Sequence, residues 1–112
     1  MTEEEIYKLI PKRFRVANHT IKVEVVPCII HSDGNMAYGQ WNEVKLTIKI
    51  AQGMKLDNEV VAFSKEQILN TFYHELFHCF RFFINLGLDD SVEEMLVQGF
   101  ANCFREYETS KH

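Results

Sequence analysis

Two histidines and a glutamate near the middle of the chain have the spacing of a metal-binding, proton-transferring group. Residues 74–78 read His-Glu-Leu-Phe-His. Side chains four positions apart on a helix lie one turn apart on the same face, so the imidazoles of His74 and His78 can reach one zinc ion. Glu75 lies about 100° further round the helix. Its carboxylate would then stand beside the ion and suit a general base acting on a metal-activated water.

A long helix is expected to carry these three residues. Ser64 and Gln67 match a capping box, which predicts that the helix begins at about Lys65. The apolar periodicity then continues over residues 65–86, and Gly87 is available as the C-cap.

Most of the circumference of this helix is apolar, and Tyr73, Phe77 and Ile84 widen the apolar surface. We therefore expect the helix to be largely buried, with only a narrow stripe reaching water or a cleft. The polar side chains fall mainly on one narrow stripe: Gln67, Asn70, Thr71, His74, His78, Arg81 and Asn85. An ordinary solvated stripe would carry Lys and Glu, whereas this one carries mostly amides, a hydroxyl and imidazoles. The composition of the stripe therefore favours a metal site over a simple solvated face.

A third ligand is needed, because catalytic zinc sites usually have three protein ligands and a water. A last helix is expected over residues 92–108, folded back antiparallel after a short connection. Glu94 near its start is the preferred ligand, because Gln98 could hold a ligand imidazole by a hydrogen bond and Ala101 would let the helices approach closely. Glu93 and no third ligand are the alternatives, since Glu94 also fits a capping box.

The rest of the chain predicts a short helix and a small sheet. Thr2 and the acids after it predict a helix over residues 3–9. Strands are expected at residues 20–26, 28–31, 36–41 and 44–50, a polar connection at 52–61, and a frayed end at 109–112. The fold class expected is a single α+β domain over residues 1–112. In it, a mainly antiparallel sheet of three to four strands packs on the buried histidine helix and on an antiparallel C-terminal helix.

Composition excludes several classes of protein. A hydrophobic content of 46% and a charged content of 25% are typical of globular domains. No apolar run approaches the roughly 20 residues that span a bilayer, and the first residues are acidic, so no membrane partner and a cytoplasmic location are expected. The three cysteines form no Cys-x-x-Cys pair, so neither a disulfide framework nor a cysteine zinc site is indicated. A net charge of −4 argues against binding nucleic acid.

The histidine motif, together with a second motif near the start of the last helix, resembles the gluzincin metallopeptidases. His74-Glu75-Leu76-Phe77-His78 is followed by 15 residues and then by Glu94-Met-Leu-Val-Gln98-Gly-Phe-Ala. In that family a Glu ligand is followed four residues later by an Asp that supports a His ligand; here Gln98 replaces this Asp. In size and element order the chain also looks like the minimal single-domain gluzincins, and like small phage or prophage metallopeptidase-like proteins related to the ImmA/IrrE and SprT-like groups.

This resemblance covers about residues 38–107. It implies Zn2+ as the cofactor, held by His74, His78 and Glu94, and a peptide or protein substrate lying along a sheet edge. By analogy residues 36–41 are the candidate edge strand.

The primary functional hypothesis is a zinc metalloendopeptidase that hydrolyses peptide bonds through a metal-activated water, with Glu75 as the general base. The alternative is a non-catalytic, zinc-stabilised protein-binding module on the same fold. Small size favours the module, as does the lack of a clear match to the residue that stabilises the oxyanion in such peptidases, for which Tyr107, Arg81 and His112 are the candidates. A third possibility is a helical-hairpin packing domain without metal. No oligomeric state is indicated.

Overall fold

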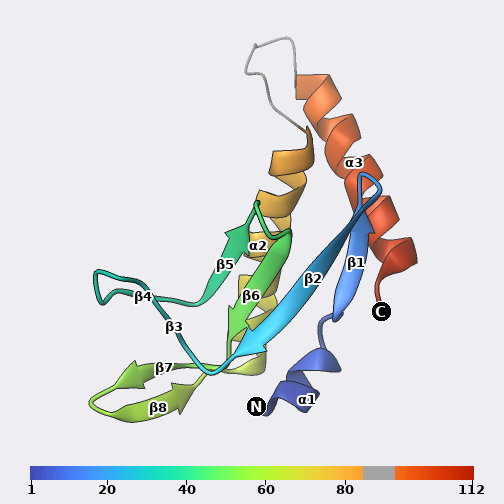
Figure 1. Ribbon diagram of the computed structural model, residues 1–112. Helices are drawn as coiled ribbons and strands as arrows, with labels where there is room; N and C mark the ends of the chain where they lie inside the picture. Colours follow the sequence, from blue (N-terminus) through green and yellow to red (C-terminus); the bar gives the residue numbers. More distant parts are fainter. Residues whose placement is uncertain (85–92) are drawn as a thin grey trace.

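The computed structural model describes residues 1–84 and 93–112, and at positions 93–98, 100 and 101 it describes the helical backbone only (Figure 1). Within these residues the chain forms three helices, a four-stranded sheet and two small two-stranded sheets, which confirms the predicted α+β class. The helices are α1 (Glu3–Tyr7), α2 (Lys65–Ile84) and α3 (Glu93–Ser110). The strands of the main sheet, in spatial order, are β1 (Arg13–Val16), β2 (His19–Val26), β6 (Thr47–Ala51) and β5 (Gly39–Asn42).

The main sheet is mixed, and two of its three strand pairs are antiparallel. β1 pairs with β2 and β5 pairs with β6 in antiparallel orientation, whereas β2 and β6 run parallel. Along β2 the buried side chains of Ile21 and Val23 alternate with the exposed side chains of Lys22 and Glu24. One face of the sheet is therefore apolar and has to be covered.

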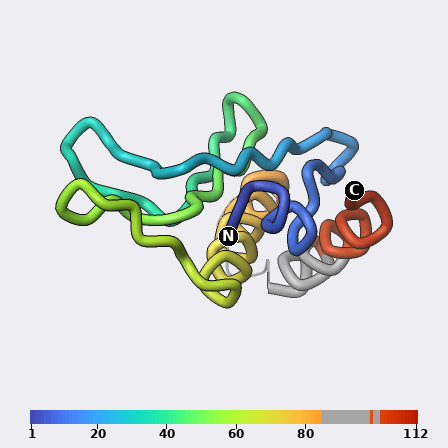
Figure 2. The backbone as a smooth tube through the Cα atoms, turned by 90° about the horizontal axis from the view of Figure 1, so that it is seen from below, coloured from blue at the N-terminus to red at the C-terminus, as the bar shows by residue number. Residues whose placement is uncertain are grey.

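Helices α2 and α3 cover the apolar face. α2 packs against β5 and β6, and α3 packs against β1 and α2. Figure 2 shows the two helices side by side on one side of the strands, and Figure 1 shows that they run in opposite directions. Among the side chains that the structure describes, the largest fully buried ones come from the sheet, from α1 and from α2: Ile6, Phe14, Val16, Ile21, Ile48, Ile50, Ile68, Phe72, Leu76 and Phe80. None of the helices, as far as they are described, is long and apolar enough to cross a membrane.

Helix α1 closes one end of the sheet. Its capping box is present: Thr2 N–H donates to the Glu5 carboxylate at 2.9 Å, and Glu5 N–H donates to Thr2 Oγ1 at 3.1 Å. The helix ends at Tyr7, earlier than the predicted residue 9. The Tyr7 hydroxyl donates to the Val23 carbonyl at 2.8 Å and accepts from Val25 N–H at 3.1 Å. It therefore satisfies backbone groups of β2 that extend past the first residue of β1.

The predicted polar connection at residues 52–61 is wrong, because a β-hairpin occupies it. β7 (Gly53–Leu56) pairs with β8 (Glu59–Ala62) in antiparallel orientation. The turn residues Asp57 and Asn58 have φ of 48° and 68°, the left-handed pair that a two-residue hairpin turn requires. Both sides of β8 are exposed, so the strand lacks the alternation by which a strand is recognised in a sequence.

A second hairpin of the same kind creates β1, which the sequence reasoning missed. Ala17 and Asn18, with φ of 49° and 63°, turn the chain between β1 and β2. The segment expected to be one strand at residues 36–41 is divided instead. β4 (Met36–Ala37) pairs with β3 (Ile29–Ile30) in a small sheet of its own, and only β5 joins the main sheet.

The end of the chain is not frayed, contrary to expectation. Lys12 N–H donates to the His112 carbonyl at 2.7 Å, and His112 N–H donates to the Arg13 carbonyl at 3.1 Å. Arg15 N–H donates to Ser110 Oγ at 2.8 Å. Residues 110–112 therefore satisfy the outer edge of β1, which would otherwise present unpaired backbone groups.

Candidate metal centre

The helix that carries the histidines begins where the sequence predicts. Ser64 N–H donates to Gln67 Oε1 at 2.7 Å, and Gln67 N–H donates to Ser64 Oγ at 3.2 Å, which confirms the capping box. α2 is described from Lys65 to Ile84. Its predicted end and the Gly87 cap lie outside the described residues.

Only one half of α2 is buried, because the sheet and α3 cover that half alone. The buried side chains are Ile68, Thr71, Phe72, Glu75, Leu76, Cys79 and Phe80. The prediction that Tyr73 and Phe77 are buried is wrong, since they are 42% and 48% exposed. Thr71, expected on the polar stripe, is buried. His74 and His78 lie on the exposed half, as predicted.

The two imidazoles are placed as ligands of one ion would be. His74 Nε2 and His78 Nε2 are 3.1 Å apart, and the ring centroids are 4.7 Å apart. Two nitrogens bound to zinc at about 2.05 Å with a tetrahedral angle would be about 3.3 Å apart. The geometry therefore fits zinc, although the same separation also allows one imidazole to donate a hydrogen bond to the other.

Glu75 is the buried member of the group. Its side chain is 7% exposed, and its carboxylate lies within 4.8 Å of the ligand nitrogens of both His74 and His78. Burial raises the pKa of the Glu75 carboxyl, while the two histidines and a hydrogen bond from the Trp41 backbone N–H lower it in part. A raised pKa suits a carboxylate that has to accept a proton and then return it.

A cleft between α2 and β5 leads to these groups. It has a volume of about 340 Å³ and is lined by Tyr38, Gly39, Asn70, Thr71, His74 and Glu75. Gly39 lets β5 approach the helix, because a Cβ built there would lie 2.6 Å from Thr71 Cγ2 and 3.1 Å from Glu75 Cγ. Sequence reasoning missed the roles of Gly39 and Trp41. A glycine inside a strand was the one available signal of a close backbone approach.

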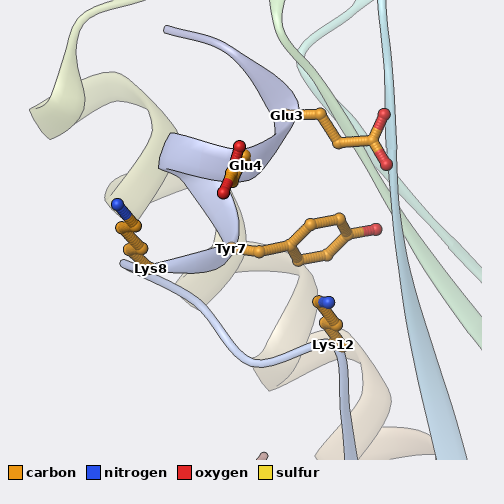
Figure 3. Close-up of a pocket in the computed structure, with 5 residues that line it drawn as sticks. All are labelled: Glu3, Glu4, Tyr7, Lys8 and Lys12. Atoms are coloured by element: carbon orange, nitrogen blue, oxygen red, sulfur yellow. The ribbon is translucent and has the colours of Figure 1, made fainter.

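A larger hollow, of about 550 Å³, lies beside α1, and no histidine lines it (Figure 3). Its lining combines acidic and basic side chains with one aromatic ring: Glu3, Glu4, Tyr7, Lys8 and Lys12. The Tyr7 hydroxyl already bonds β2, and Lys12 Nζ lies 5.5 Å from the centre of the Tyr7 ring. This hollow is explained by the packing of α1 and does not compete with the histidine cleft as a catalytic site.

The predicted third ligand cannot be compared with a side-chain position. Glu94 and its alternative Glu93 belong to α3, but their side chains, like that of Gln98, lie outside the described residues. Gly99 of α3 is a packing site, because a Cβ there would lie 3.0 Å from Ile84 Cγ1 of α2. The role of Glu94 stays a prediction.

Two of the three oxyanion candidates lie away from the cleft. Tyr107 is 3% exposed and packs against Phe14 and Phe72, so it belongs to the core. His112 is held through its backbone at the outer edge of β1. Arg81, three positions after His78, is on the exposed side of α2 and is the candidate that remains near the histidines.

Comparisons of this chain with protein-family models, with curated proteins and with solved structures find no match. A functional assignment therefore depends on the geometry of the histidine cleft and on the resemblance carried by residues 74–101.

Proposed function

We propose that this protein is a zinc-dependent peptidase of the gluzincin type, in which His74 and His78 bind the metal and Glu75 is the general base. The observation that carries the proposal is the convergence of three groups. Two exposed imidazole nitrogens stand 3.1 Å apart, and a buried carboxylate lies within 4.8 Å of both. Structural zinc sites are usually closed by four protein ligands, whereas here an open cleft adjoins His74 and Glu75.

The outer edge of β5, which pairs with no further strand in the described part of the chain, favours a peptide substrate. Ala51 N–H donates to the Tyr38 carbonyl at 2.9 Å, and in an antiparallel ladder such contacts recur at every second residue. Gly39 and Trp41 therefore turn their backbone groups away from β6. The hydrogen bond from Trp41 N–H to Glu75 agrees with this direction. An extended peptide added to this edge would run past the carboxylate of Glu75.

The chemistry assigned to Glu75 is proton transfer. Zinc, when bound, would act as a Lewis acid toward the peptide carbonyl and make water more acidic. Glu75 accepts the proton of the water whose oxygen adds to the carbonyl carbon. It then gives that proton to the amine nitrogen as the C–N bond breaks. A peptide paired with β5 would be extended and would lie against Tyr38 and Gly39 of the cleft, which would position its carbonyl for this transfer.

Glu75→Gln tests the proposal. The variant should keep its zinc, measured by elemental analysis, and should lose at least about a hundredfold in hydrolysis of an unfolded, carboxymethylated protein. Glu66→Gln is the matched control, because Glu66 lies in the exposed first turn of the same helix. Hydrolysis by Glu75→Gln at the rate of the control would remove Glu75 from the mechanism.

The third ligand needs its own comparison. Glu94→Ala should weaken zinc binding by at least about tenfold in a competition titration with a chromogenic chelator, whereas Glu93→Ala should leave it unchanged. Equal effects of the two substitutions would contradict the assignment of Glu94.

A non-catalytic, zinc-stabilised binding module is the second candidate, and the packing of the two helices favours it. Ile84 lies beside Gly99, and Phe80 lies beside Phe104 at a centroid distance of 6.1 Å. In this antiparallel register His78 is nearer the middle of α3 than its start, where Glu94 lies. The register therefore weighs against a three-ligand peptidase centre that includes Glu94, and so favours the module. Chelation that lowers the melting temperature of a protein without peptidase activity would identify the module. The cytoplasmic location stays a prediction in either case.

A further inference from the structure

An aromatic wall, formed by Trp41, Phe82 and Phe83, stands beside the proposed catalytic group, because the Trp41 backbone N–H bonds Glu75. The Trp41 ring centroid is 6.0 Å from that of Phe82 and 6.4 Å from that of Phe83. The Phe82 and Phe83 centroids are 5.0 Å apart. Phe82 is 39% exposed although it is apolar, so the wall still presents surface that a ligand can cover.

The wall is held in a fixed position relative to Glu75 and His78. Phe82 comes four residues after His78, which corresponds to about 6 Å along the helix axis. The backbone N–H of Trp41 bonds the Glu75 carboxylate, so the residue that contributes the indole ring also holds the proposed base. One residue of extended chain advances about 3.3 Å. A side chain one or two residues from the scissile bond would therefore reach the wall.

The indole of Trp41 has a hydrogen-bonding group that its surroundings do not satisfy. Trp41 Nε1 is buried and has no acceptor among the described residues. Buried donors are nearly always paired in native proteins, and exceptions call for an explanation. A peptide carbonyl brought against the wall would supply the missing acceptor after a small rotation of the ring.

We propose that Trp41 and Phe82 form the subsite for a large apolar side chain of the substrate, so that the site selects unfolded segments with an aromatic residue beside the scissile bond. The inference rests on the proposed function, because the subsite is defined relative to Glu75 and His78. Aromatic side chains are buried in folded proteins, so this preference directs the site to unfolded chains.

Fluorescence of Trp41 tests the subsite without any cleavage. The chain has one tryptophan, so its emission reports this position alone. Zinc-loaded Glu75→Gln protein is titrated with capped hexapeptides of alanine that carry one central Phe, Ala or Glu. The Phe peptide should shift the emission to shorter wavelength and bind at least about tenfold more tightly than the Ala peptide. Calorimetry repeats the comparison without depending on the indole.

Phe82→Ala should reduce the preference for Phe over Ala to less than about threefold. Phe104→Ala is the matched control, since Phe104 is 37% exposed and packs on Phe80 in the interface of α2 and α3. Circular dichroism establishes that both variants fold, and Phe82→Leu, which keeps an apolar side chain, should retain part of the preference.

Equal binding of the Phe and Ala peptides, or equal losses in Phe82→Ala and Phe104→Ala, would overturn the inference. Hydrolysis by the native zinc protein that shows no preference for aromatic residues would also overturn it, while leaving the proposed function in place. Selective binding of the Phe peptide without hydrolysis would support the subsite and contradict the peptidase.

Discussion

Replacing Gly39 with alanine should press the edge strand away from the helix that carries the histidines. A Cβ at this position would lie 2.6 Å from Thr71 Cγ2, closer than Cβ atoms approach other atoms in proteins. It would also lie 3.1 Å from both Glu75 Cγ and the Lys49 carbonyl oxygen. β5 is held by its pairing with β6, and Thr71 and Glu75 belong to the buried face of α2, so relief of these contacts requires a shift of one element against the other.

The cost can be estimated from these contacts. Overpacking of a closely packed site costs about 1–3 kcal/mol of unfolding free energy. Thr71→Ser removes the nearest atom and by itself should cost about 1 kcal/mol for the lost buried methyl. In the double variant the nearest contacts are those at 3.1 Å, to Glu75 and Lys49. Thr71→Ser should therefore recover roughly 1 kcal/mol of the penalty of Gly39→Ala.

Urea unfolding of the metal-free protein, followed by circular dichroism, measures all four members of this cycle. Gly34→Ala is the control: it makes the same chemical change at φ of 87° with no atom within 4 Å, so Thr71→Ser should not recover its cost. Additive effects of Gly39→Ala and Thr71→Ser would show that β5 and α2 do not meet at this point. The account of how Glu75 is held would then be wrong.

Three other outcomes are expected from described contacts. Asn58→Gly should stabilise the protein by about 0.5 kcal/mol, because Asn58 adopts a φ of 68° that glycine accepts without strain; an unchanged or lower melting temperature would contradict the turn. Iodoacetamide at pH 8 should modify Cys28 well before Cys79, since burial raises the pKa of the Cys79 thiol; equal rates by mass spectrometry would contradict that burial. Deleting residues 110–112 should cost about 2 kcal/mol in urea unfolding, because hydrogen bonds to β1 are lost, and an unchanged midpoint would oppose this.

The features that sequence reasoning found correctly are those fixed within a few residues. The capping box of Ser64 and Gln67 sets the start of α2, and the i,i+4 spacing sets the separation of His74 and His78. Both depend on helical geometry alone, so no knowledge of the rest of the chain is needed. The absence of disulfides among Cys28, Cys79 and Cys103 was likewise readable from their number and spacing, and all three are free.

The features that were missed depend on partners far away in the sequence. The Gly39 and Trp41 positions matter because β5 lies against α2, a contact between segments more than 30 residues apart. Residues 110–112 looked free because their partners lie at the start of β1, almost the whole chain away. Periodicity describes which face of an element is apolar, but it does not identify what covers that face.

The wrong prediction for Tyr73 and Phe77 shows that periodicity is an incomplete guide to burial in the histidine helix too. A broad apolar arc on a helix predicts burial only if neighbours surround the helix, and α2 has the sheet and α3 on one half. The boundary between the covered and exposed halves passes between His74 and Glu75, because successive residues are about 100° apart. In the proposed mechanism, that boundary would allow the buried carboxylate of Glu75 to act on a water beside a metal bound by the exposed imidazoles of His74 and His78. A helix buried except for one narrow polar stripe, as the sequence suggested, would have left a smaller opening to His74 and His78 than the exposed half of α2 does.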